Sequence, residues 1–392
     1  MSFFTAGATA PLALGLFAIA TPLVDYATEA KQYSTDVACA LLLLSASRPW
    51  LRPETDMSTA WRIGIVGAAC LWLSYPALFV LAGIGVVVAG RAVTTPELRA
   101  PAAFAGLCWG ISSALIYIIS VRTLAANATL LEYWRSSFWP VAEPGALRWP
   151  LDALMAFVSD VAGVQPIFLG LVLAALGFAW LAWTRSGTAI VLTTPLLLTL
   201  FASAMDAYPF SGRLLLFATP CLFLTMAAGL TAGIHVWPKR IARLSWLPTV
   251  AVSLAVLYEP SKAAMSRLVE PRTPEHIRPA IGYMMSHRRS DDHLYVYYGA
   301  KPAFRFYARS LAVPSGGLTL GRAHRDEPQA YLAEIDAEGT TRRLWLLFSH
   351  ECPFCPVPET NVILKGLDKR GRRLDQFETT GAATYLYELS AR

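Results

Sequence analysis

The densest group of residues that could do chemistry lies between two apolar runs near the start of the chain, in the segment DYATEAKQYSTD at 25–36. If this segment is helical, Asp25, Glu29 and Tyr33 share one face at a spacing of four residues, with Asp36 next along. Ionisable side chains at a membrane boundary cost free energy and usually mark a functional site. The carboxylates could serve acid–base chemistry or bind a divalent metal ion, although no histidine joins them. The alternative is a surface turn with ordinary interfacial anchors.

Two further segments combine aromatic residues with arginine. In DAYPFSGR, Tyr208 and Arg213 come directly before an apolar run. The Arg213 guanidinium could hold a phosphate through its planar set of donors, or it could only reach the lipid headgroups from a helix end. In LEYWRSSFWP, Trp134 and Trp139 could contact a substrate. Aromatic residues at a membrane boundary are usually anchors, which is the alternative for this segment.

The elements that must position these residues are expected to lie in a membrane. Of the 392 residues, 55% are hydrophobic and 15% are charged, whereas soluble domains contain roughly 25% charged residues. Residues 1–258 hold 25 of the Asp, Glu, Lys and Arg residues, and residues 259–392 hold the other 35. Each part has a net charge of +3, so no basic stripe indicates binding to nucleic acid. We expect a multi-spanning membrane domain over 1–258 and a water-soluble domain over 259–392.

The fold class predicted for the first part is an α-helical polytopic membrane protein. A helix needs about 20 apolar residues to cross the hydrocarbon core, or fewer where protein surrounds it. About nine spans are predicted, some of them short, near 3–23, 34–47, 59–74, 76–90, 102–121, 165–184, 188–205, 213–234 and 246–258. We divide 59–90 at Ser74-Tyr75-Pro76 because proline disfavours helix in the residue before it. An undivided helix is the alternative, and it would invert the topology of everything that follows.

The distribution of Lys and Arg gives the orientation of these spans. With the division at Pro76, one set of connections contains nine Lys and Arg residues and the other set contains five. The positive-inside rule places the richer set in the cytoplasm. We therefore predict a multi-pass protein of the plasma (inner) membrane whose carboxyl-terminal domain is extracytoplasmic.

The second part is expected to be an α/β domain. Strands are predicted at 293–298, 343–349 and 384–389, with helices near 274–287, 301–308 and 359–370. Cys352 and Cys355 follow the second strand as CPFC. A structural disulfide is the favoured interpretation because an oxidising compartment permits it, and thiol–disulfide exchange and unpaired thiols are the alternatives. The other four cysteines lie in apolar spans and are expected to pack there: Cys39, Cys70, Cys108 and Cys221.

With these segments in this order, the sequence resembles the lipid-linked-sugar glycosyltransferases of the GT-C type. Among them it is similar to the bacterial family-39 transferases, kin to protein mannosyltransferases and to the aminoarabinose transferase of lipid A. The resemblance rests on YATEAKQYSTD from Tyr26, WLSYP from Trp72, Trp134 with FWP from Phe138, and YPFSGR ending at Arg213. It extends into the second part through YVYY and WLLFSH. Each motif is weak alone, and their order together with the matching topology makes the combination specific.

The resemblance implies an inverting transfer from a polyprenyl-phosphate sugar donor to a cell-envelope acceptor at the outer face of the membrane. A leaving lipid phosphate needs cations to stabilise its charge, and the acceptor hydroxyl needs a base. Lys31 and Arg213 are expected to bind the phosphate, and Glu29 and Asp36 to be the catalytic carboxylates. The expected substrate-binding set is Lys31, Tyr33, Trp134, Trp139, Tyr208 and Arg213. The partners are then the donor, the acceptor and membrane lipids; no cofactor is certain, and a divalent metal ion is possible.

The sequence departs from the family pattern at its start. Such enzymes begin with a transmembrane helix and an outer loop that carries an acidic residue, and roughly the first quarter of a family member is expected to be absent here. A misplaced start codon, an inactive form, or a base supplied by another chain would each explain this departure. Two other function classes therefore stay open, namely a transporter or flippase of a lipid-linked substrate and a non-catalytic membrane scaffold.

Overall fold

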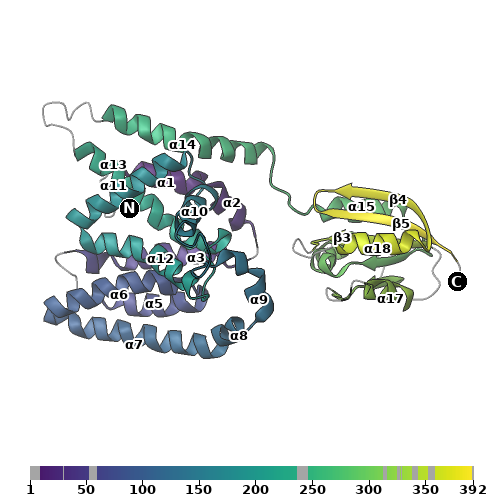
Figure 1. Cartoon of the computed structure of the whole chain (residues 1–392), viewed down its shortest axis with the longest axis horizontal. Coiled ribbons are helices and arrows are strands. Elements are labelled where there is room, and N and C mark those ends of the chain that lie inside the picture. The colour runs from purple at the N-terminus through teal and green to yellow at the C-terminus, as the bar shows by residue number, and fades with distance from the viewer. Residues whose placement is uncertain are drawn as a thin grey trace. The chain divides into compact units, whose positions relative to one another are not determined.

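The computed structural model describes residues 9–29, 31–52, 60–235, 246–311, 316–324, 327, 329–337, 343–351 and 358–390. The chain divides into two compact units, Met1–Pro271 and Arg272–Arg392, and each is described by itself (Figure 1). The expected boundary after residue 258 therefore lies after Pro271 instead. The reason is that helix α14 (Trp246–Val269) continues through the expected boundary as one element.

The described part of the first unit is helical. Its α-helices are α1 (Ala10–Ile19), α2 (Thr21–Ala27), α3 (Tyr33–Ala46), α5 (Arg62–Leu73), α6 (Ala77–Thr94), α7 (Arg99–Ile116), α8 (Arg122–Ala125), α9 (Ala128–Tyr133), α10 (Trp149–Ala156), α11 (Ile167–Thr184), α12 (Ser186–Ala204), α13 (Thr219–His235) and α14. Short 3₁₀ segments are η1 (Arg48–Leu51), η2 (Pro96–Leu98), η4 (Arg135–Ser137) and η6 (Gly212–Ala218), and π-helical turns are η3 (Tyr117–Val121) and η5 (Phe157–Val161).

Five helical runs among the described residues are long and apolar enough to cross a membrane: Ala77–Thr94, Pro96–Leu124, Ile167–Thr184, Ser186–Ala204 and Gly212–His235. The pair α1 and α2, bent by 49°, would make a sixth if counted as one span. Helices α3 and α5 are apolar but shorter. A span was expected at 246–258, but helix α14, which contains these residues, is not among the candidates. The reason is that polar residues follow its apolar first half. The chain is thus a mostly helical protein with several membrane-length helices.

Two expectations about breaks between helices can be checked directly. The division of 59–90 is confirmed, because α5 ends at Leu73 and α6 begins at Ala77, with Ser74 extended at φ −154° and ψ 111°. The condition that 25–36 forms one helix is not met, because α2 ends at Ala27 and α3 begins only at Tyr33. The side chains of the first predicted cluster therefore come from two helices and the turn between them.

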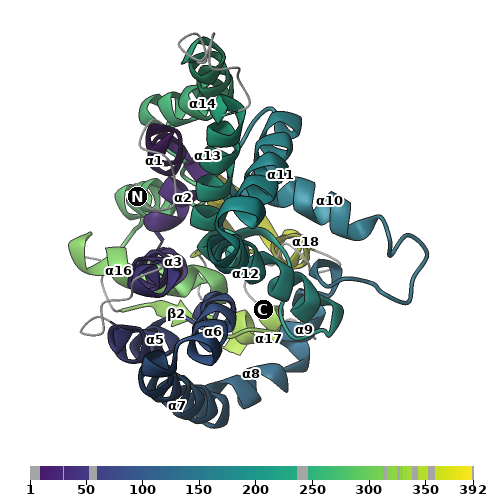
Figure 2. The ribbon, with the colours of Figure 1, turned by 90° about the vertical axis from the view of Figure 1, so that its left-hand side faces the viewer.

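Helices α11 and α13 cross at very short distance. A Cβ atom on Gly177 would lie 1.8 Å from the Thr225 carbonyl oxygen, and one on Gly229 would lie 2.0 Å from the Leu173 carbonyl oxygen. Only glycine permits backbones to approach this closely. Helix α13 is the most buried of the membrane-length helices, and α3 packs beside α5 and α6 (Figure 2).

The second unit is an α/β domain around a five-stranded sheet of order β2-β1-β3-β5-β4. The strands are β1 (His293–Val296), β2 (Leu318–Leu320), β3 (Arg343–Ser349), β4 (Gly371–Thr379) and β5 (Ala382–Leu389), and the helices are α15 (Ile277–His287), α16 (Lys301–Ser310), α17 (Ala330–Ala337) and α18 (Glu359–Asp368), with a 3₁₀ turn at Tyr298–Ala300. Strand β1 is parallel to β2 and β3, whereas β5 is antiparallel to β3 and β4. Gly381, at φ +65°, makes the tight turn between β4 and β5.

The sheet separates two apolar cores. Alternate side chains of β1, β3 and β5 point to opposite faces, as strand geometry requires. Helices α15 and α16 cover one face, where Phe304 and Met284 pack on Trp345 and Leu347. Helices α17 and α18 cover the other face, against Tyr295, Leu346 and Tyr387 among others.

Candidate functional site

Arg213 contacts the faces of two aromatic rings. Its Cζ atom lies 5.5 Å from the centroid of the Tyr33 ring and 5.7 Å from that of Trp134. Both distances allow cation–π attraction, which orients a guanidinium without neutralising its charge. Its Nε atom is buried and has no hydrogen-bond partner among the residues that the structure describes. Such an orphaned donor is rare in folded proteins and indicates a place where another group can bind.

Two hydrogen bonds position the segment that carries Trp134. The Phe210 N–H donates to the Ser137 carbonyl oxygen at 2.9 Å, and the Trp139 N–H donates to Ser203 Oγ at 3.0 Å. The segment that carries Trp134 is therefore held beside the segment that leads to Arg213. The sequence indicated both segments but not that they pair.

Tyr33 connects Arg213 to the first cluster. It is buried at the start of α3, and it interacts electrostatically with Arg213 and Glu29. The Tyr26 ring packs edge-on against it with centroids 5.3 Å apart. Lys31 forms an ion pair with Glu29 at 3.5 Å instead of standing alone. Of the two cations expected to bind a phosphate, Arg213 is therefore the one without a carboxylate partner in the described part of the chain.

Asp36 lies one turn further along α3, where only 7% of its surface is exposed. It lies beside Ser74, at the break between α5 and α6, and interacts electrostatically with Tyr208. The Asp36 Oδ1 and Ser74 Oγ atoms are buried, and neither has a hydrogen-bond partner within the described ranges. The Tyr208 hydroxyl donates to the Leu214 carbonyl oxygen at 3.0 Å, which fixes its ring next to Phe79.

We call this group of residues the Arg213 cluster: Glu29, Tyr33, Asp36, Ser74, Trp134, Tyr208 and Arg213. It joins a guanidinium that has no ion-pair partner among the described residues to a buried carboxylate through aromatic side chains. A guanidinium can bind two oxygens of one phosphate, and a carboxylate can accept a proton from a hydroxyl. The arrangement therefore suits an anionic ligand that also presents hydroxyl groups.

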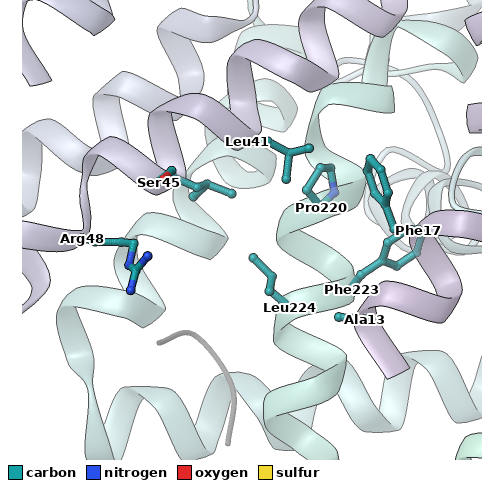
Figure 3. Close-up of a pocket in the computed structure, with 9 residues that line it drawn as sticks. Ala13, Phe17, Leu41, Ser45, Arg48, Pro220, Phe223 and Leu224 are labelled. Atoms are coloured by element: carbon teal, nitrogen blue, oxygen red, sulfur yellow. The ribbon is translucent and has the colours of Figure 1, made fainter. Parts of the chain in front are cut away.

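An apolar groove runs along α3 from this cluster. A cavity of about 450 Å³ lies between α1, α2 and α3, and Tyr26 and Tyr33 line it at the end near Arg213. A second cavity, of about 150 Å³, continues between α1, α3 and α13 (Figure 3). Phe17 and Leu41 line both cavities, so we treat them as one feature and call it the α1–α3 groove. Arg48 lies at the far end of the groove, and the rest of its lining is almost entirely apolar.

Trp139 is placed differently from the other expected substrate-binding residues. Its ring stacks on Trp149 with centroids 6.3 Å apart and planes 8° apart, and its indole N–H donates to the Ala146 carbonyl oxygen at 2.8 Å. Trp149 in turn packs against Phe210. These contacts give Trp139 a role in holding the loop that carries Trp134, and they occupy its indole N–H.

The remaining predicted positions include two that fall outside the described residues, Cys352 and Cys355. The described cysteines are unbonded, and three of the four are buried, as packing residues should be. Asp25 forms an ion pair with Arg267 at 3.4 Å, which ties α2 to α14. No group of three His, Cys, Asp or Glu side chains among the described residues could hold a metal ion.

Sequence reasoning missed three features of this site. Tyr26 stood inside the motif but was not selected, and Ser74 was read only as a helix break. The α1–α3 groove could not be found, because it depends on how α1, α3 and α13 pack.

Comparison with known proteins identifies no family for this chain: no protein-family model matches the sequence, and no curated protein matches it.

Proposed function

We propose that this chain is a membrane glycosyltransferase of the GT-C kind, which moves a sugar from a polyprenyl-phosphate donor to a cell-envelope acceptor. The observation that most supports this proposal is the environment of the Arg213 guanidinium. Its guanidinium contacts two aromatic rings, lacks a carboxylate partner among the described residues, and lies next to the tyrosine that lines the α1–α3 groove. A lipid phosphate has a group for each part of this site: its charged head can bind Arg213, and its long apolar chain can lie in the α1–α3 groove.

The reaction that we propose is a single displacement at the anomeric carbon of the sugar. The acceptor hydroxyl forms the new C–O bond, the bond to the lipid phosphate breaks, and the phosphate leaves with the electron pair. Arg213 stabilises the charge that develops on the phosphate. Asp36 accepts the proton of the acceptor hydroxyl, because it is buried and has no cationic partner in the described residues. Glu29, paired with Lys31, positions the sugar or the acceptor.

The surroundings of the site are part of the same proposal. The protein spans the plasma (inner) membrane about nine times, and the shorter apolar helices α3 and α5 are counted among these spans. The second unit is extracytoplasmic. The nine-to-five distribution of Lys and Arg between the two sets of connections supports this orientation.

A second candidate function is the movement of a lipid-linked substrate across the membrane without chemistry. One observation favours it: the α1–α3 groove has Arg213 near one end and Arg48 at the other. A path with a cation near each end could exchange a phosphate headgroup between two sides.

The test is sugar transfer by the purified chain in proteoliposomes that contain a polyprenyl-phosphate sugar. Arg213→Lys keeps the charge but loses the planar pair of donors. We expect turnover to fall about 100-fold or more, because removal of a hydrogen-bond donor that stabilises charge in a transition state has an effect of this size in other enzymes. The matched control is Arg122→Lys, an exposed arginine outside the cluster, which should transfer normally. Equal turnover in both variants would remove Arg213 from the site. Movement of the lipid across the bilayer without transfer would favour the second candidate.

A further inference from the structure

The helices on the two faces of the carboxyl-terminal sheet carry opposite charges. Helices α15 and α16 together contain four Lys or Arg residues and no Asp or Glu. Helices α17 and α18 contain four acidic residues and one lysine. Because each pair covers its own face of the sheet, the domain has one basic and one acidic side.

The acidic side is neutralised from within the domain. Asp336 pairs with Arg370 at 2.8 Å, and Asp368 pairs with Arg373 at 3.5 Å. Glu359 is buried and accepts a hydrogen bond from the Tyr331 hydroxyl at 2.8 Å. This side of the domain therefore offers little uncompensated charge to a partner.

The basic residues of α15 and α16 have no such compensation among the described side chains. The four basic residues of α15 and α16 form no ion pair within the described part of the chain: Arg278, Lys301, Arg305 and Arg309. All except Lys301 are exposed. Four positive charges on one face, without an ion-pair partner among the described residues, suit an anionic surface.

Phe306 projects from the same face. It lies on α16 between Arg305 and Arg309, and 75% of its surface is exposed, whereas Phe304 on the inner side of the helix is buried. An exposed aromatic ring flanked by arginines is typical of segments that lie at a lipid–water interface, where the ring enters the acyl boundary and the cations meet headgroups. An apolar ring with charges around it suits a bilayer better than it suits a purely polar partner.

We propose that the face formed by α15 and α16 docks on the membrane surface, with Phe306 in the interface and the four basic residues on anionic phospholipid headgroups. The domain follows membrane-length helices in the same chain, which is why we propose a lipid surface as the anionic partner. The proposal rests on the charges and exposure of the second unit and does not depend on glycosyl transfer.

The test measures the exposure of Phe306 in the full chain. Hydroxyl-radical oxidation of Phe306, read by mass spectrometry relative to α18 on the opposite face, is compared in three settings: nanodiscs containing phosphatidylglycerol, nanodiscs of phosphatidylcholine alone, and detergent. Phe306 should be protected only in the anionic nanodiscs, and protection should decline as salt screens the headgroups. Each basic residue near an anionic surface favours docking about five-fold, so Arg305→Glu with Arg309→Glu should lower the docked population at least about 25-fold.

The matched control is Lys365→Glu with Lys369→Glu, which reverses two charges at α18 and should leave protection unchanged. Equal oxidation in anionic and neutral nanodiscs would overturn the proposal. So would protection that persists in detergent, because it would show that another part of the chain covers Phe306. An equal loss of Phe306 protection in both double variants would also contradict the proposal. The net charge of the domain, and not the face formed by α15 and α16, would then control docking.

Discussion

The crossing of α11 and α13 predicts a stability difference between two glycines of the same helix. In Gly229→Ala the new methyl carbon would lie 2.0 Å from the Leu173 carbonyl oxygen, whereas ordinary contact begins at 3.4 Å. Backbone atoms cannot rotate away as a side chain does, so the two helices must separate. Gly233, one turn further along α13, has nothing within 4 Å of the equivalent position.

The magnitude follows from two opposing terms. Overpacking a well-packed interior costs about 1–3 kcal/mol and sometimes more, and a backbone clash of this depth belongs at the upper end. Alanine gains about 1 kcal/mol over glycine in a helix interior. We therefore expect Gly229→Ala to lose about 2 kcal/mol overall, and Gly233→Ala to be as stable as the parent or slightly more stable.

The assay is the fraction of protein that stays folded in detergent during titration with a denaturing detergent. Gly229→Ala should unfold earlier than the parent, and Gly233→Ala should not. If both variants unfold with the parent, the close crossing of α11 and α13 is refuted. Because α13 also forms one wall of the groove, Gly229→Ala should in addition weaken binding of a long-chain lipid more than binding of a short-chain one.

Three further predictions concern the second unit. Burial raises the pKa of Asp292, but hydrogen bonds from Arg343 at 2.7 Å and Trp345 at 2.9 Å outweigh burial and hold that pKa below its ordinary value. Its stabilising effect is therefore present above the unfolded pKa of about 3.9 and is lost as pH falls through the folded pKa. Asp292→Asn should lower the free energy of unfolding by about 3 kcal/mol at pH 7 and leave it unchanged at low pH, as measured by hydrogen exchange of the sheet. An equal loss of stability at both pH values would contradict this. If Cys352 and Cys355 form a structural disulfide, replacing both with serine should cost roughly 2–4 kcal/mol at most and leave transfer intact at low temperature; lost transfer with unchanged stability would indicate redox chemistry. A phosphatase fused to the carboxyl terminus should be active, whereas activity of a reporter that works only in the cytoplasm would overturn the orientation.

The parts of the fold that depend on local patterns could be predicted from the sequence. The break at Ser74, the main strands β1, β3 and β5, and most of the helices follow from apolar runs and proline. Strand β4 was missed because it is an edge strand with the sequence GRRLDQFET, which has no apolar run. Strand β2 is three residues long, too short for a pattern to reveal. The sequence leaves open whether 25–36 forms one helix, because apolar periodicity does not reveal where a polar segment turns.

The candidate site was predictable in composition but not in geometry. Tyr33, Asp36, Trp134 and Arg213 were all selected by residue type, and the structure brings them into one cluster. The pairing of Lys31 with Glu29, and the absence of such a partner for Arg213 in the described residues, depend on side-chain positions that spacing does not determine. The groove could not be inferred because it is a property of three helices together.

The most direct test of the central claim is the binding of a polyprenyl phosphate to the purified chain, measured by native mass spectrometry. We predict one lipid phosphate per chain and weaker binding of the same polyprenol without its phosphate. In Arg213→Lys the affinity should be at least about ten-fold lower, because the paired charged hydrogen bonds are worth roughly 1.5–3 kcal/mol. Arg122→Lys should bind as the parent does. Binding that is independent of the phosphate, or equal in Arg213→Lys and Arg122→Lys, would contradict the account.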